Sequence, residues 1–319
     1  MTRHFSKILM VSVAAVAVTL AGGLATAAGF PEKPITMLIG FNPGGAVDTT
    51  GRIVADKLSK ILGQPVVAVT KAGGGGTIMA SQLINADPDG YTIGMGASAA
   101  YTLTPLINKN IKYKIGDFTH LATLTYPSDA IVVKADSPYK SLKDMIEAHK
   151  KDKKPISFAS QVSASRLMVM TISDKTGVEF KVIPVKGGAI GIQEVLGGHI
   201  DTTWSGSGWT EQVRAGKMRA LATMAPDRMK DFPDVPTLDE LGYNFHFVDT
   251  FMLSAPKGVP ADVVAKLQGA LKQIMSDPEV QETLHSKLKL LTKYRDSKET
   301  TEFLNKQRAD VEPLVAKLK

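Results

Sequence analysis

The feature that most constrains this chain is an apolar segment that runs into a helix through glycine. Residues 37–41 are predicted to form a strand, residues 43–45 read Pro-Gly-Gly and form a turn, and from Val54 apolar residues recur at i, i+4, i+7 and i+8 until Gly63 ends the helix. A helix that begins this way leaves backbone N–H groups unpaired at the positive end of its dipole, and glycine places no side chain in front of them. The turn is therefore predicted to bind an anion.

The same unit recurs along the chain. Three further strands lead into small or polar loops, at residues 66–76, 91–98 and 156–163. Strands that alternate with helices form parallel sheets with right-handed crossovers, and the loops at their carboxyl ends gather at one edge, where ligands bind. The alternation predicts an α/β protein with doubly wound sheets.

The chain is predicted to pass twice between two α/β lobes. Strands at residues 121–125 and 130–134 flank the first crossing, a long apolar strand at residues 245–255 makes the second, and the chain after residue 262 is expected to be helical. The predicted units are a leader at 1–28, lobe 1 at 29–128 and 250–319, and lobe 2 at 129–249. Two lobes joined by two crossing strands form a hinge with a cleft, as in proteins that close on a ligand.

The N-terminus has the pattern of a secretory signal peptide. Basic residues within the first seven positions precede an apolar run at residues 8–20, and small residues follow for cleavage near Ala27 or Ala28. The run is shorter than the roughly 20 residues of a membrane span, which disfavours the alternative of an uncleaved anchor. We expect export to a bacterial periplasm.

The composition excludes several kinds of chemistry. The 319 residues contain no cysteine, so disulfides, thiolate catalysis and zinc–thiolate sites are ruled out. The formal net charge is +7, and the basic residues are scattered through predicted helices and loops. That charge either suits an acidic ligand or belongs to a solvated surface, and the scatter favours the surface. No nucleic-acid partner is expected.

Several motifs, in one order along the mature chain, resemble those of a known family. The first is Phe41-x-Pro-Gly-Gly-x-x-Asp48, and the others include Asp87-Pro-Asp-Gly-Tyr-Thr92, Lys186-Gly-Gly188, Leu196-Gly-Gly-x-x-Asp201, Phe232-Pro-Asp-Val-Pro-Thr237 and Ala255-Pro-Lys-Gly258. One such motif is weak, whereas this many in order are specific. The chain resembles the periplasmic substrate-binding proteins of tripartite tricarboxylate transporters over essentially all of its mature length.

The resemblance implies a type II periplasmic-binding-protein fold, the Venus flytrap. In this family a small carboxylate is captured between the lobes and passed to two integral-membrane transporter subunits. Carried onto this chain, the residues implied for the ligand site are Gly44, Gly45, Ala46, Asp48, Ala97 and Ser98 in lobe 1, and Ser160, Ser163, Ser165, Lys186, Gly187 and Ser205 in lobe 2. A dicarboxylate, a tricarboxylate, an aromatic acid or an amino acid would all suit such loops, and we expect a monomer without a cofactor.

The chain departs from the usual family pattern at three points of lobe 2. Residues 161–166 replace a Gly-x-Gly run ending in histidine, Val185 stands where tyrosine is common, and residues 205–207 replace an Asp-Asn pair. The floor of the pocket is therefore expected to differ from the common one.

Four candidate residues have a structural alternative to ligand binding. Asp48 either hydrogen-bonds the ligand or serves as the acid that favours a helix N-terminus. Arg166 either grips a carboxylate bidentately or lies on a helix surface. Trp204 either stacks on an aromatic ligand or packs in the core, and Lys186 either supplies charge to the ligand or pairs with a surface acid.

An enzyme is not expected. The six histidines show no metal-ligand spacing, none lies beside a serine-rich loop, and residues 96–100 only partly resemble a nucleophile elbow. Residues 73–76 lack the Lys-Ser/Thr of a P-loop, and residues 94–99 match a dinucleotide fingerprint only superficially. The alternatives to transport are a binding protein that signals to a membrane sensor kinase and, less favoured, a periplasmic hydrolase.

Overall fold

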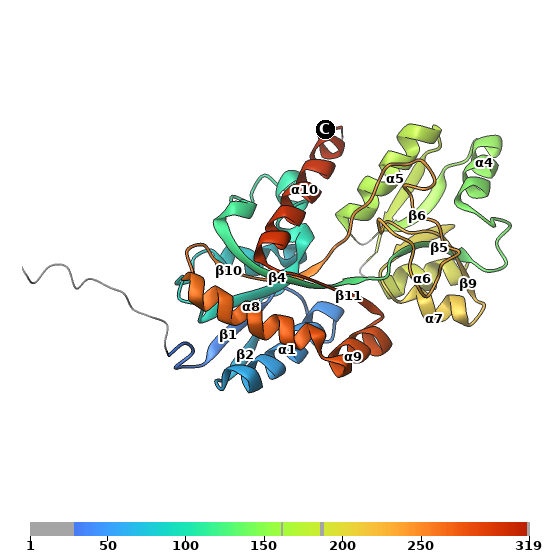
Figure 1. Cartoon of the computed structure of the whole chain (residues 1–319). Helices are drawn as coiled ribbons and strands as arrows, with labels where there is room; N and C mark the ends of the chain where they lie inside the picture. The colour runs from blue at the N-terminus through green and yellow to red at the C-terminus, as the bar shows by residue number, and fades with distance from the viewer. Residues whose placement is uncertain (1–28, 161, 186–187, 318–319) are drawn as a thin grey trace, which may run out of the picture.

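Two α/β lobes, each built on its own sheet, lie side by side in the computed structural model (Figure 1). The structure describes residues 29–160, 162–185 and 188–317. The chain leaves the sheet of lobe 1 after β4, builds the whole sheet of lobe 2, and returns at β10. The predicted two-lobe α/β fold is confirmed.

The sheet of lobe 1 has six strands in the order β11-β4-β10-β3-β1-β2. These strands are β1 (Ile35–Ile39), β2 (Val66–Thr70), β3 (Thr92–Ala97), β4 (Phe118–Pro127), β10 (Phe251–Pro256) and β11 (Leu290–Arg295). β1 pairs in parallel with both β2 and β3, whereas β10 runs antiparallel to both β3 and β4. The carboxyl ends of β1 and β3 therefore meet at one edge of the sheet.

The sheet of lobe 2 has five strands in the order β7-β6-β8-β5-β9. They are β5 (Ala130–Lys134), β6 (Ile156–Ser160), β7 (Phe180–Pro184), β8 (Thr202–Ser205) and β9 (Met218–Ala222). β6 is parallel to β7 and β8, and β5 is antiparallel to β8 and β9. Each sheet thus joins a parallel set of strands to antiparallel pairs on one side, formed by β10, β4 and β11 in lobe 1 and by β5 and β9 in lobe 2.

Helices cover both sheets. Lobe 1 contains α1 (Ala46–Leu62), α2 (Thr77–Leu83), α3 (Thr104–Ile107), α8 (Ala261–Ser276), α9 (Pro278–Leu288) and α10 (Ser297–Ala316), and lobe 2 contains α4 (Leu142–Asp152), α5 (Ser163–Thr176), α6 (Gly188–Leu196) and α7 (Trp209–Arg214). In α1 the predicted apolar face is confirmed at Val54 and Leu58, which are fully buried, whereas Ile61 is exposed. None of the described helices combines the length and apolar character needed to cross a membrane.

Side-chain caps start three of these helices. Ser141 accepts a hydrogen bond from the amide of Asp144, 3.1 Å away, at the start of α4. Asp277 caps α9, with Pro278 in the first turn, and Asp296 forms a reciprocal capping box with Glu299 at α10. Each cap satisfies amides that the first turn of a helix leaves unpaired.

The second crossing and the C-terminal region differ from the prediction. The strand expected at residues 245–255 starts only at Phe251, because Phe245 and Phe247 are buried in the core of lobe 2 instead of pairing with a neighbouring strand. The C-terminal region is not wholly helical, since β11 pairs with β4 along the edge of the lobe 1 sheet. Pro313 lies inside α10 and does not end it.

The return crossing is fixed to lobe 1 by hydrogen bonds to its backbone. Ser98 Oγ donates to the Val248 carbonyl, 3.2 Å away, and accepts from the Thr250 amide, 3.1 Å away. Gln307 Nε2 on α10 donates to the same Val248 carbonyl at 2.7 Å, and its Oε1 accepts from Thr102 Oγ1. Ser98 and Gln307, which lie in separate parts of lobe 1, thereby hold the same carbonyl group of the crossing.

Each crossing also carries an acid. Asp129 accepts hydrogen bonds from Thr223 Oγ1 and from the Met224 amide, both 3.2 Å away, and Asp249 accepts one from the Ala99 amide at 2.9 Å. Burial raises the pKa of Asp129 to about 7 and that of Asp249 to about 6, and the negative charge of Asp249 adds to the shift of Asp129. Both acids therefore titrate closer to neutral pH than an exposed carboxyl does.

The helix α10 belongs to lobe 1 but ends in the core of lobe 2. Leu304 lies in a buried cluster of lobe 1, whereas Val311 and Val315 belong to the cluster that contains Phe245 and Phe247. Figure 1 shows the C-terminal half of this helix rising toward α5, against which it packs. The helix therefore links the two lobes in addition to the two crossings.

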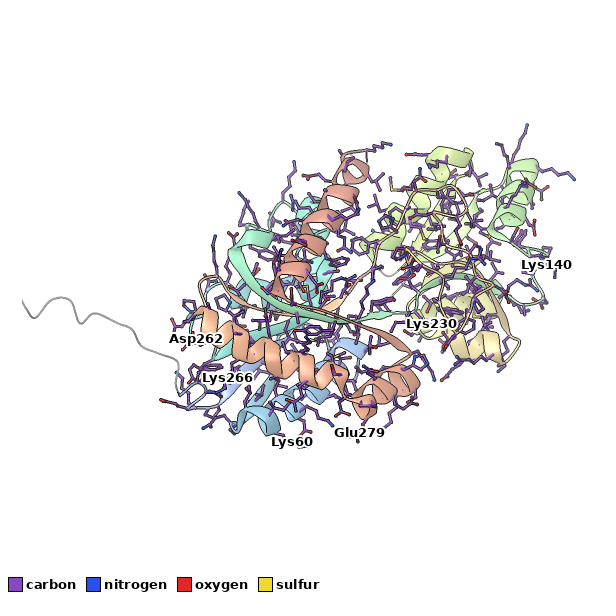
Figure 2. The ribbon with its side chains drawn as sticks, in the orientation of Figure 1. Lys60, Lys140, Lys230, Asp262, Lys266 and Glu279 are labelled. Atoms are coloured by element: carbon purple, nitrogen blue, oxygen red, sulfur yellow. The ribbon has the colours of Figure 1, made fainter. Side chains whose placement is uncertain are left out.

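Charged side chains are spread over both lobes, as their scatter in the sequence indicated. In Figure 2 the labelled Lys60, Lys266 and Glu279 come from helices of lobe 1, and Lys140 and Lys230 come from loops of lobe 2.

Replacing Asp129 by asparagine should change how stability depends on pH. Because the folded-state pKa is raised from 3.8 to about 7, folded protein holds a proton that the unfolded chain loses between these values, and stability falls as pH rises through this window. Asp129→Asn removes that proton and keeps an oxygen for Thr223 and Met224. In urea titrations from pH 4 to 8, its free energy of unfolding should fall less steeply than that of wild type, by up to about 1.4 kcal/mol per pH unit. Parallel curves would contradict the assignment.

Shortening Val311 should destabilise the protein although it lies near the C-terminus. Val311 is 1% exposed, and Val311→Ala removes two methyl groups from the core of lobe 2, so we expect a loss of about 1–3 kcal/mol in the free energy of unfolding. The matched control is Asn305→Ala on the exposed side of α10, which should change stability by less than about 0.5 kcal/mol. Equal effects in denaturant titrations would show that the end of α10 contributes no packing.

Candidate functional site

A cleft of about 1070 Å³ lies between the two lobes. Its lobe 1 side is formed by residues 41–47, Ala97, Pro127, Asp249, Phe251 and residues 287–290, and its lobe 2 side includes Val162, Gly188, Ala189, Ile192, Gln193, Leu196, residues 204–208, Glu211 and Gln212. The cleft lies where the crossings join the lobes, since Pro127 and Phe251 are residues of the two strands next to them.

On the side of lobe 1, an open helix N-terminus faces the cleft. Gly44 has φ +81°, which glycine adopts without strain, and Gly45 is the N-cap of α1 without a side-chain hydrogen bond to the helix. The amides of Ala46, Val47 and Asp48 have no hydrogen-bond partner within the described chain. Ala46 and Val47 line the cleft, so the positive end of α1 is presented to whatever enters it.

On the side of lobe 2, two further helices begin at the cleft. The helix α6 starts at Gly188, and α7 follows the lining residues 206–208 without a side-chain cap. Ser205 lies between β8 and this turn, and its hydroxyl has no hydrogen-bond partner among the described residues. Small residues at helix starts thus line the cleft from both lobes.

Trp204 is packed in the core and also reaches the cleft. Its side chain is 6% exposed and belongs to the core of lobe 2, yet it also lines the cleft. Its indole Nε1 is buried and has no hydrogen-bond partner in the described part of the chain. The ring is therefore a core residue with an edge at the site.

Asp48, a predicted ligand residue, is engaged in the structure of α1. Its carboxylate accepts hydrogen bonds from the Gly44 amide at 3.0 Å and from the Arg52 guanidinium through two bonds of 2.9 Å. The Arg52 hydrogen bond is the largest of the effects that lower the pKa of Asp48. The side chain is buried, and Asp48 is not among the described residues that line the cleft.

The other predicted residues divide into those that line the cleft and those that do not. Gly44, Gly45, Ala46, Ala97 and Ser205 line it. Ser98, Ser160 and Ser165 are buried behind it, where Ser160 Oγ and Ser165 Oγ lie 2.9 Å apart and both reach the Val162 carbonyl. The structure brings the lobe 1 glycines to the site but uses these hydroxyls to hold the protein's own loops.

Ser163 and Arg166 begin α5 beside the cleft without lining it. Ser163 is half-buried, and Arg166 is exposed and has no ion pair within the described chain. Lys186 and Gly187 lie outside the described residues, although Gly188 and Ala189, which follow them, do line the cleft.

Several lining residues were not predicted from the sequence. They are mainly Gln193 and Gln212 on lobe 2, Asp249 and Phe251 at the return crossing, and residues 287–290 between α9 and β11. The glutamines lie on the first helices after the predicted turns, so the positions of those turns could have indicated that they line the cleft. No such indication exists in the sequence for residues 287–290, because only the pairing of β11 with β4 brings them to the cleft.

The junction between α9 and β11 also touches lobe 2 across the cleft. The Lys289 carbonyl accepts hydrogen bonds from Ser128 Oγ at 3.1 Å and from Ser207 Oγ at 2.9 Å. The Lys289 ammonium lies 3.8 Å from the Glu211 carboxylate. Lys287 is exposed at the same rim and forms no ion pair with a described residue.

Among residues 29–160, 162–185 and 188–317 no three His, Cys, Asp or Glu side chains are placed to hold a metal ion. The site therefore offers amides, hydroxyls and a few charges.

Comparison with known proteins identifies the family. The model of the tripartite tricarboxylate transporter family receptor matches residues 50–319. A UPF0065 protein from Cupriavidus necator is 35% identical over 320 aligned residues, which cover 98% of this chain and 97% of that protein.

Solved structures show the same fold. A TctC solute-binding protein from Polaromonas, without ligand, matches 90% of this chain and 99% of its own with a TM-score of 0.79 at 28% identity. MatC from Rhodopseudomonas palustris, with bound malate, matches 90% of this chain and 100% of its own with a TM-score of 0.74 at 25% identity. The predicted type II-like periplasmic-binding-protein fold is confirmed, and the chain belongs to the tripartite tricarboxylate transporter receptor family of solute-binding proteins.

Proposed function

We propose that this protein binds a small carboxylate in the cleft between its lobes and delivers it to the two membrane subunits of a tripartite tricarboxylate-type transporter. It acts in the periplasm, after removal of residues 1–28, and it catalyses no reaction. The family and the malate found in the related MatC support the ligand class.

The observation that carries the proposal is the open start of α1. Three amides at the start of a helix of 17 residues have no partner among the described residues, and two of their residues line the cleft. The charge of Asp48 does not cancel this positive end, because Arg52 forms an ion pair with it at 2.9 Å. A carboxylate placed at Ala46 and Val47 would satisfy these amides through charge-assisted hydrogen bonds.

Capture requires binding interactions only. The cleft replaces the water around a carboxylate with amides and hydroxyls, and exclusion of water between the lobes strengthens those hydrogen bonds. The ligand-facing groups of lobe 2 in this scheme are Ser205 and the first turns of α6 and α7. Ser163, Arg166, Lys186 and Gly187 belong to the same side and stay candidates for the far end of the ligand.

Thermal unfolding should reveal the ligand class. Residues 29–319, unfolded and refolded to remove any ligand carried through purification, should be stabilised by mono-, di- or tricarboxylates or aromatic acids and not by neutral sugars. A ligand at 100 times its dissociation constant adds about 2.7 kcal/mol, which raises the melting temperature by a few degrees. Stabilisation by a sugar, with none by any acid, would overturn the carboxylate proposal.

Ser205→Ala should weaken the binding of whichever acid stabilises the protein. The hydroxyl lines the cleft without an internal partner, so removing it costs one ligand hydrogen bond and no internal one. We expect the dissociation constant in calorimetry to rise about 3- to 10-fold, the effect of one neutral hydrogen bond. The control is Ser81→Ala on the exposed side of α2, which should bind like wild type. An unchanged affinity in Ser205→Ala would remove this hydroxyl from the site.

A further inference from the structure

An acid lines a cleft that is otherwise suited to anions. Asp249 lies two residues before Phe251, and Phe251 pairs with Ala97 across β10 and β3. All three residues line the cleft. The carboxyl group of Asp249 therefore lies at the floor, beside the end of β3.

The protein holds this carboxyl group by one of its two oxygens. Asp249 Oδ1 accepts from the Ala99 amide at 2.9 Å and from Ser98 Oγ at 3.4 Å. Asp249 Oδ2 has no hydrogen-bond partner in residues 29–160, 162–185 and 188–317. The anchored oxygen fixes the orientation of the group, and Oδ2 is the oxygen that remains for the cleft.

No cation of the described chain compensates this acid. Asp249 forms no ion pair with a described residue, and its charged neighbour Asp129 on the other crossing is also an acid. Of the other charged cleft residues, Lys289 is paired with Glu211, and Lys287 lies exposed at the rim. Asp249 is partly exposed to the cleft, so water can solvate Oδ2 in the free protein. A ligand that displaces this water without offering a hydrogen-bond donor leaves the carboxylate unpaired, which is costly, whereas a ligand with a donor avoids that cost.

We propose that Asp249 is a specificity-determining residue whose free oxygen accepts a hydrogen bond from a hydroxyl or ammonium group that the ligand carries in addition to its carboxylate. This inference rests on the proposed function and narrows it. The cleft selects hydroxy acids or amino acids over acids of the same carbon skeleton without such a donor, because those acids leave Oδ2 desolvated and unpaired.

Matched sets of three acids test the proposal. Each set shares one skeleton that bears hydrogen, hydroxyl or ammonium: propionate, lactate and alanine; succinate, malate and aspartate; glutarate, 2-hydroxyglutarate and glutamate. For the set that binds, calorimetry on refolded residues 29–319 should show the hydroxy or amino member binding at least about 10-fold tighter than the unsubstituted member. Equal or tighter binding of the unsubstituted acid would overturn the proposal. So would a protein that binds only aromatic acids that carry no hydroxyl or ammonium group.

Asp249→Asn should remove this preference for a physical reason specific to the site. The asparagine oxygen is needed at the Ala99 amide, so its NH₂ group takes the place of Oδ2 and an acceptor becomes a donor. The affinity ratio between the substituted and unsubstituted acids should fall at least about 10-fold. Asp129→Asn is the matched control, because it removes the other hinge acid without changing the cleft lining, and its ratio should stay within about 3-fold of wild type.

A measurement on the wild-type protein covers the case in which Asp249→Asn does not fold. A donor against Oδ2 favours the ionised carboxyl, whose pKa is raised to about 6 in the free protein, so binding at pH 6 should release protons. Calorimetry in two buffers of different ionisation enthalpy measures the number of protons released for each ligand bound. Proton uptake would overturn the role of Asp249, whereas failure of every acid to bind would overturn the proposed function itself.

Discussion

The hydroxyl of Ser98 is the contact on which the arrangement of the two lobes depends. This side chain is fully buried, and it joins the turn after β3 to the carbonyl of Val248 and the amide of Thr250. A buried hydroxyl that both donates and accepts leaves no unsatisfied group, so the crossing can run through the interior without a strand partner. Because β10 begins directly after this point, the same contact sets where Asp249 and Phe251 meet the cleft. A residue predicted to touch the ligand instead positions the residues that do line the site.

The helices differ in how they begin, and three of the uncapped starts lie at the cleft. The helices α4, α9 and α10 start with side-chain caps from Ser141, Asp277 and Asp296. The helices α1, α5 and α7 have no such cap, and the residues at their starts, Gly45, Val162 and Gly208, line the cleft. An uncapped start costs stability of order 1 kcal/mol per helix relative to a capped one. At the three uncapped starts that line the cleft a ligand can supply the missing partner, whereas α2, α3 and α8 begin without a side-chain cap away from the cleft.

Much of the fold was predictable because its signals are local. The strand Ala130–Lys134 was predicted to the residue, since apolar residues there are bounded by polar ones. The starts of α4, α9 and α10 carry equally local signals in their capping residues. Residues 245–250 misled the prediction because their aromatic side chains are buried by lobe 2, so an apolar pattern arose without a strand. The strand β11 was missed because it lies at the edge of the sheet and pairs with β4, which is far away in sequence.

The candidate site was predictable only at the glycine-rich turn that starts α1. Gly44, Gly45 and Ala46 stand out because a helix start rich in glycine has few other uses. The sequence does not show whether a serine bonds a ligand or its own backbone, and Ser160 and Ser165 do the latter. Asp249 and residues 287–290 reach the cleft through pairings of strands distant in sequence, which no local pattern encodes.

The helix α10 starts on lobe 1 and ends in the core of lobe 2, so its far end would be displaced if the lobes rotated. Its 20 residues span roughly 30 Å, so a rotation of the lobes by roughly 10° about its first turn displaces its far end by roughly 5 Å. Such a displacement equals about one helical turn, which is enough to separate Val311 from the aromatic side chains beside it or to return it to them. If the lobes rotate, the separation between the end of α10 and α5 changes with the angle between them, and a pair of spectroscopic labels on these two helices would convert that angle into a distance.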